Sequence, residues 1–143
     1  MPVKILFTTH ATATGGRNGH TESADKLVSV DLSVPKAMGG PGKPGTTTPE
    51  DLFAAGYAAC FGGAVDFVAK QKKINVSDVT VEAAVGFGTT DEGHFQLKVD
   101  LTVFLKGLDQ AAAQSLVEAA HQVCPYSRAT RNNIEVSLKA VTR

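Results

Sequence analysis

Two cysteines, Cys60 and Cys124, are the residues of this chain most able to carry covalent chemistry, and they form no Cys-x-x-Cys motif. The apolar run at Ile5–Phe7 is too short for a signal peptide, so we expect a cytoplasmic location. Structural disulfides are rare there, and a cysteine pair is more often catalytic or redox-active. For Cys60, which lies within the apolar stretch Leu52–Val65, the alternative is a small buried hydrophobe.

A catalytic Cys60 needs a cation beside its sulfur. The thiolate is the nucleophile, and burial alone raises the pKa of a thiol above its ordinary value of about 8.5. The field of the helix dipole fades within the first turn, so it does not reach Cys60. Arg17, in the glycine-rich segment GGRNG, is the best candidate for the cation. The alternative for Arg17 is a solvated turn residue.

Glu50 can serve either the helix or the site. In the first turn of a helix a carboxylate stabilises the positive end of the dipole by about 0.3–1 kcal/mol. It can also hold a guanidinium through a bidentate pair. Glu50 precedes Cys60 by ten residues, or about 15 Å of helix, so it could act on the thiol only through a long side chain such as Arg17. A relay of Cys60, Arg17 and Glu50 is therefore a hypothesis.

Cys124 has several possible roles. It ends a predicted helix, where the negative end of the dipole disfavours a thiolate, so it suits a resolving thiol better than an attacking one. With His121 it forms a His-x-x-Cys pair that could ligate zinc, but a closed zinc site needs four ligands. A Cys–His hydrolase built on Cys60 is a further alternative without a supporting local motif. The remaining histidines are scattered along the chain: His10, His20 and His94.

Hydrophobic periodicity predicts one α+β domain over residues 1–143, in the order β-β-α-β-β-α-β. Thr48, Pro49 and Asp51 predict the start of the long helix through a capping box, and Asp109 caps the second helix. The predicted strands are Val3–Thr12, Lys26–Val34, Val76–Gly88, Phe95–Leu105 and Ile134–Val141. The predicted helices are Pro49–Lys70 and Gln110–Val123.

The long helix is apolar on every face between Leu52 and Val65, which predicts burial on all sides. One stripe along this helix consists of small side chains, which let another element approach closely. A chain of 143 residues has little material to enclose such a helix, so we expect a dimer. The formal net charge is zero, which argues against binding to nucleic acid or to an anionic membrane surface.

Four segments together resemble one protein family: GGRNGH (15–20), PEDLFAAGYAACF (49–61), VCPYS (123–127) and ATRNNIEVSL (129–138). The chain resembles the organic hydroperoxide resistance proteins, the Ohr branch of the OsmC/Ohr family, over nearly its whole length. The resemblance implies an intertwined homodimer in which antiparallel sheets wrap around long central helices. The active sites would lie at the subunit interface.

The resemblance also implies a thiol peroxidase that reduces organic hydroperoxides to alcohols. Cys60 matches the attacking cysteine, Cys124 the resolving cysteine, Arg17 the arginine that stabilises the thiolate, and Glu50 the glutamate that orients it. No bound cofactor or metal is expected, and the external reductant would be a dihydrolipoyl dithiol on a lipoylated carrier protein. Three departures from the family pattern remove no proposed catalytic group: Thr48, Arg128 and Asn132. A sensor module whose cysteines only report redox state remains the alternative from another class.

Overall fold

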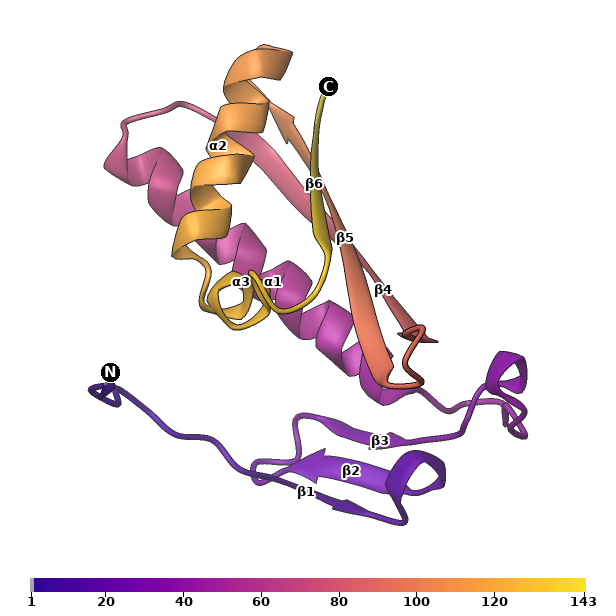
Figure 1. Cartoon of the computed structure of the whole chain (residues 1–143). Coiled ribbons are helices and arrows are strands. Elements are labelled where there is room, and N and C mark those ends of the chain that lie inside the picture. Colours follow the sequence, from indigo (N-terminus) through magenta and orange to yellow (C-terminus); the bar gives the residue numbers. More distant parts are fainter. Residues whose placement is uncertain (1) are drawn as a thin grey trace. The chain divides into compact units, whose positions relative to one another are not determined.

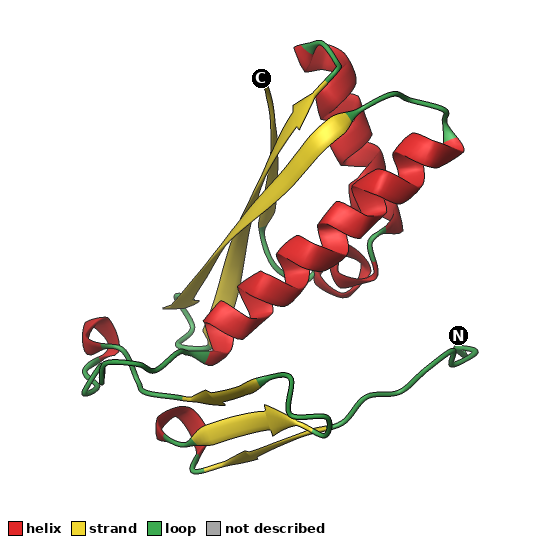
Figure 2. Ribbon diagram, turned by 180° about the vertical axis from the view of Figure 1, so that it is seen from behind, coloured by secondary structure: helices red, strands yellow, loops and turns green. Residues whose placement is uncertain are grey.

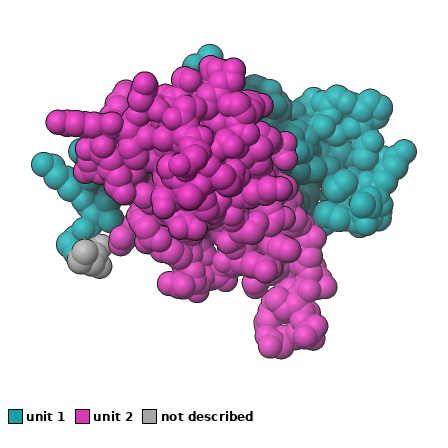
Figure 3. Space-filling model, turned by 90° about the horizontal axis from the view of Figure 1, so that it is seen from above, with its two compact units in different colours: residues 1–52 teal, residues 53–143 magenta. Residues whose placement is uncertain are grey.

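The computed structural model describes residues 2–143, and the chain divides into two compact units (Figure 3). Unit 1 extends to Leu52, and unit 2 runs from Phe53 to Arg143. Both contain a three-stranded sheet built mainly from antiparallel pairs, and the helices follow groups of strands along the chain, so the α+β class is confirmed. The assignment of residues 1–143 to one domain stays a prediction.

Unit 1 contains a small antiparallel sheet in the order β1-β2-β3 (Figure 1). Its strands are β1 (Ala11–Thr14), β2 (His20–Ser23) and β3 (Ser29–Asp31). Two short 3-10 helices complete it, η1 (Gly16–Asn18) and η2 (Lys36–Met38). The η1 turn connects β1 to β2, and glycines at its edges supply the backbone freedom: Gly15 has a φ of 79°.

Three predictions for unit 1 were inaccurate. The first strand was expected at Val3–Thr12, but β1 is Ala11–Thr14 and residues 2–10 belong to no strand. Apolar alternation indicates a strand only where a neighbouring strand accepts its hydrogen bonds. The strand predicted at Lys26–Val34 is shortened to β3. The β2 strand was missed because its residues, His-Thr-Glu-Ser, carry no apolar alternation.

Unit 2 is a three-stranded sheet with helices on one face, as the two opposite views in Figures 1 and 2 show. Its strands are β4 (Ser77–Thr89), β5 (Phe95–Lys106) and β6 (Val136–Thr142). Its helices are α1 (Pro49–Gln71), which begins in the last residues of unit 1, α2 (Gln110–Val123) and α3 (Pro125–Thr130). The core lies between these layers, with residues from α1, β5 and α2 as its main contributors.

The sheet of unit 2 is mixed, which corrects the expectation of purely antiparallel sheets. β4 and β5 form the predicted antiparallel hairpin, whereas β6 runs parallel to β5. A parallel neighbour requires a crossover, and α2 and α3 together provide it. The segment after Cys124 forms the six-residue helix α3.

The start of α1 follows the predicted capping box. The Asp51 backbone N–H donates to the Thr48 hydroxyl at 3.1 Å, and the Thr48 N–H donates to the Asp51 carboxylate at 3.1 Å. The Thr48 hydroxyl also lowers the pKa of Asp51 by donating to its carboxylate. Pro49 occupies the first helical position, where its missing N–H is not needed. These contacts fix the residue at which α1 begins, and with it the direction of each later side chain on the helix.

The single chain buries one face of α1, and burial on all sides stays a prediction that needs a second copy. One face packs into the core of unit 2 through large side chains such as Tyr57, Phe61 and Val65. The opposite face is exposed and carries the small residues Ala55, Ala59 and Gly63. Phe67 follows on the same face and is 55% exposed. Among residues 2–143, α1 is the one helix whose length and apolar composition would suffice to cross a membrane. Here it serves as the core helix.

Candidate active site

The two cysteines meet in unit 2, although 64 positions separate them in the chain. The Cys124 thiol donates to the Cys60 sulfur across 3.7 Å, and both cysteines are free thiols. Cys124 is fully buried, whereas Cys60 is partly exposed. The more accessible sulfur is therefore the one that the sequence assigns as the attacking nucleophile.

Helix ends position Cys124. It closes α2, where its backbone N–H donates to the Ala120 carbonyl, and it also precedes α3, where its carbonyl accepts from the Arg128 N–H at 3.0 Å. Pro125 occupies the first position of α3. The sequence predicted that Cys124 ends a helix, and the structure shows that Cys124 is also the N-cap of a second helix.

Burial raises the pKa of the Cys60 thiol above its ordinary value. The neighbouring Cys124 thiol acts in the same direction, and the Tyr126 backbone N–H, which hydrogen-bonds the sulfur, acts against both. Within unit 2 the balance favours the protonated thiol. A reactive Cys60 therefore depends on a positive charge, as the sequence led us to expect.

Arg17 and Glu50, the other two predicted site residues, form an ion pair in unit 1. Nη1 of Arg17 donates to both carboxylate oxygens of Glu50, at 2.7 and 3.2 Å. In these two hydrogen bonds one guanidinium nitrogen reaches both oxygens of the carboxylate. The Glu50 side chain is 14% exposed and that of Arg17 is 38% exposed. The carboxylate thus limits the positions open to a long, flexible side chain.

The turn that carries Arg17 is fastened to the chain after β3. The Asn18 side-chain oxygen accepts from the Val34 N–H at 2.9 Å, and the Gly19 carbonyl accepts from the Leu32 N–H at 2.8 Å. A Cβ added at Gly19 would lie 1.7 Å from the Thr14 carbonyl oxygen, so only glycine fits. The segment GGRNG is therefore an ordered turn and not a mobile loop tip.

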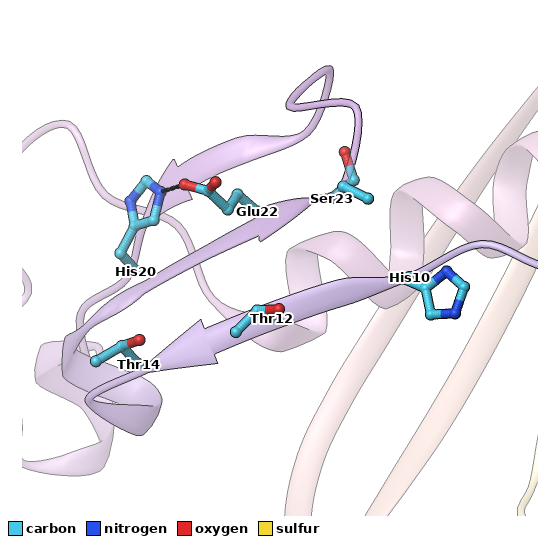
Figure 4. A pocket seen from close by; sticks show the side chains of 7 residues that line it. His10, Thr12, Thr14, His20, Glu22 and Ser23 are labelled. Atoms are coloured by element: carbon cyan, nitrogen blue, oxygen red, sulfur yellow. Dashed lines mark hydrogen bonds and ion pairs between the residues drawn. The ribbon is translucent and has the colours of Figure 1, made fainter.

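His20 reinforces this turn from the first residue of β2. Its Nδ1 lies 2.8 Å from the Asp31 carboxylate. Its Nε2 lies 3.1 Å from the Glu22 carboxylate, a contact that Figure 4 marks with a dashed line. Ionised carboxylates only accept hydrogen bonds, so both contacts are satisfied together by the imidazolium form alone. Accordingly the pKa of His20 is raised, first by the hydrogen bond to Asp31.

Sequence reasoning missed a hydroxyl cluster beside the cysteines. The Tyr57 hydroxyl contacts the hydroxyls of Ser127 and Thr130 at 2.8 and 3.0 Å, and all three residues are buried. It also missed the Tyr126 N–H. The signals were the position of Tyr57, three residues before Cys60, and the serine in VCPYS.

Within residues 2–143, no group of three or more His, Cys, Asp or Glu side chains lies close enough together to hold a metal ion. His121, the partner considered for zinc, has its pKa lowered by burial and by Arg131. Its ring packs 6.5 Å from that of Phe61, between centroids.

A family model described as "OsmC-like protein" matches residues 40–139. An organic hydroperoxide resistance protein of Xanthomonas axonopodis pv. citri is 51% identical over 138 residues, which cover 96% of each chain. The organic hydroperoxide resistance protein OhrB of Bacillus subtilis is 48% identical over 135 residues, 94% of this chain and 97% of that one.

Solved structures of organic hydroperoxide resistance proteins have a similar fold. That of an organic hydroperoxide resistance protein from Elizabethkingia anophelis superposes with a TM-score of 0.91 at 47% identity, covering 99% of this chain and 100% of that one. The crystal structure of Bacillus subtilis OhrB superposes with a TM-score of 0.87, covering 96% of this chain and 100% of that one.

Proposed function

The chain belongs to the OsmC-like family, in its organic hydroperoxide resistance branch, and from that membership we propose that it is a cysteine-based peroxidase that reduces organic hydroperoxides to alcohols. Its relatives support a peroxide-detoxifying enzyme with an organic hydroperoxide substrate. The observation that carries the chemistry is the 3.7 Å contact between the sulfurs of Cys60 and Cys124. A small movement would bring the two sulfurs to the length of a disulfide bond, about 2.05 Å.

The reaction follows from the different surroundings of the two thiols. The Cys60 thiolate attacks the terminal oxygen of the hydroperoxide, the O–O bond breaks, and the alkoxide leaves as alcohol after taking up a proton. Cys60 is then a sulfenic acid. The Cys124 thiol attacks its sulfur, the S–O bond breaks, and water leaves as the disulfide forms. The burial of Cys124 keeps this second thiol from bulk solvent until then.

Arg17 and Glu50 supply the charge that the thiolate needs in this proposal. The Arg17 guanidinium would stabilise the Cys60 anion, and the Glu50 carboxylate would hold the guanidinium in one orientation. The hydrogen bond from the Val34 N–H to Asn18, which holds the turn that carries Arg17, supports such a role, because a cation stabilises a thiolate best when its position is restrained.

The reductant in this proposal is a dihydrolipoyl dithiol on a carrier protein, with no bound cofactor and a cytoplasmic location, where dithiol reductants are maintained. The apolar side chains near Cys60 on α1, such as Phe53 and the buried Phe61, favour alkyl over hydrogen peroxide. Each buried CH₂ of a substrate contributes about 0.8 kcal/mol.

Steady-state turnover tests the proposed function. With dihydrolipoamide and an alkyl hydroperoxide such as cumene hydroperoxide, we expect continuous consumption of peroxide over many equivalents per chain. Hydrogen peroxide should react more slowly. A redox sensor would consume about one equivalent and stop, and that result would contradict the peroxidase.

We also propose that the protein works as a homodimer whose second copy covers the exposed face of α1. Small residues there, Ala55, Ala59 and Gly63, allow close approach, and the exposed Phe67 would be buried. Sedimentation equilibrium at micromolar concentration should give the mass of two chains, and a single-chain mass would refute the dimer.

The charge of Arg17 should set the reactivity of Cys60. Substituting Arg17→Ala should raise the pKa of Cys60 by about 1 to 3, because a cation within about 4–6 Å favours the thiolate by that amount. Glu50→Gln should have a smaller effect, because it leaves the cation in place. The pH dependence of thiolate absorbance in the ultraviolet measures both. An unchanged titration of Arg17→Ala would rule out the electrostatic role.

A further inference from the structure

We propose that the Tyr57 hydroxyl is a positioning group for the cysteine pair: through Ser127 and Thr130 it fixes α3 on α1, so that Cys124 faces Cys60. The inference rests on the proposed function for its catalytic meaning. Its geometry, however, lies entirely within unit 2.

The three hydroxyls form a hydrogen-bonded chain that ends on a backbone carbonyl. The Thr130 hydroxyl donates its single proton to the Ser127 carbonyl at 3.2 Å, so toward Tyr57 it can only accept. Tyr57 therefore donates to Thr130, and Ser127 donates to Tyr57. Tyr57 and Ser127 have no exposed surface and Thr130 is 5% exposed. A fully satisfied, buried polar network of this kind specifies one arrangement of its elements.

The position of α3 depends on this network because the helix cannot hold itself. Six residues are too few for a helix that is stable on its own. The network ties the third and the last residue of α3, Ser127 and Thr130, to α1, and the Tyr126 ring at the start of α3 packs 5.8 Å from the Tyr57 ring. Tyr57 of α1 therefore contacts both turns of α3.

The two cysteines lie next to the residues that this network holds, so the network affects the distance between their sulfurs. Cys60 follows Tyr57 by three residues on α1 and so lies on the same side of the helix. Cys124 directly precedes α3, and the Tyr126 N–H at its start bonds the Cys60 sulfur. Closing 3.7 Å to a disulfide takes about 1.7 Å of movement, and a misplacement of about 1 Å can cost a hundredfold in rate.

Closure of the disulfide can be tested without peroxide. Oxidised glutathione converts Cys60 to a mixed disulfide, and the Cys124 thiolate then displaces glutathione, which leaves as the thiol while the S–S bond to Cys60 forms. We expect Tyr57→Phe to slow this unimolecular step by about fivefold or more, the effect of one lost buried hydrogen bond. Acid quenching and mass spectrometry follow the mixed disulfide. Closure within twofold of the wild-type rate would overturn the inference.

Matched variants separate positioning from stability. Thr130→Ser keeps the hydroxyl and should close at the wild-type rate, whereas Thr130→Val keeps the shape, removes the hydroxyl and should resemble Tyr57→Phe. This pair carries the test if Tyr57→Phe fails to fold. Val103→Ala, in the middle of β5, lowers stability and should leave closure unchanged. Equal slowing by Val103→Ala would show a merely structural role.

The same experiment distinguishes this inference from the proposed function. If closure from oxidised glutathione is slowed by Tyr57→Phe but the wild-type protein consumes no alkyl hydroperoxide, the peroxidase proposal fails and the role of Tyr57 stands. If peroxide turnover is normal and closure is insensitive to Tyr57, the role of Tyr57 fails and the peroxidase stands.

Discussion

Replacing Cys60 with serine should abolish peroxide turnover, by at least about a thousandfold, the scale of losing a catalytic nucleophile. The serine hydroxyl is not ionised near neutral pH, and its neutral oxygen does not attack an O–O bond at a useful rate. The change is nearly isosteric, and Cys60 is partly exposed, so the fold should persist. Consumption of an alkyl hydroperoxide with dihydrolipoamide measures the loss.

The melting temperature of Cys60→Ser is the control, and it should stay within a few degrees of wild type. Residual turnover above about one per cent in a folded variant would contradict the assignment of Cys60. It would direct attention to Cys124 as the nucleophile instead.

Replacing Cys124 with serine should separate the first chemical step from the second. The variant should reduce about one equivalent of hydroperoxide per chain and then stop, because no thiol remains 3.7 Å from Cys60 to resolve the sulfenic acid. The first attack should not slow, since the Cys124 thiol contributes to the raised pKa of Cys60. Excess peroxide should then drive Cys60 to the sulfinic acid.

Mass spectrometry distinguishes these states of the Cys124→Ser variant by one and two added oxygens on Cys60. Sustained turnover with dihydrolipoamide would mean that the external dithiol resolves the sulfenic acid directly. In that case the contact between Cys60 and Cys124 would be dispensable for catalysis.

Local signals in the sequence predicted what local interactions decide. Thr48, Asp51 and Asp109 marked the helix starts, because a cap bonds to residues within one turn. The strands β4 and β5 were predicted because each carries its own apolar alternation. The parallel placement of β6 was not, because it depends on a crossover through α2 and α3, and residues 2–10 show apolar alternation without a pairing strand.

The candidate site divides in the same way. The electrostatic need of a buried thiol pointed to Arg17 and Glu50 as possible partners, and the structure joins these two in an ion pair. The meeting of Cys60 and Cys124 was implied by family resemblance, because no spacing rule connects residues 64 positions apart. The network of Tyr57, Ser127 and Thr130 could not be predicted, since hydroxyls at such separations pair only once the helices have packed.

Cys124 is held by helical hydrogen bonds on both sides, through its N–H to Ala120 and its carbonyl from Arg128. A main chain restrained in this manner cannot slide, so the sulfurs approach each other chiefly by torsion about the Cα–Cβ bonds. Such side-chain rotations require no rearrangement of the backbone. After every round of oxidation the reductant would accordingly restore the two thiols of unit 2 without a change in the backbone around them.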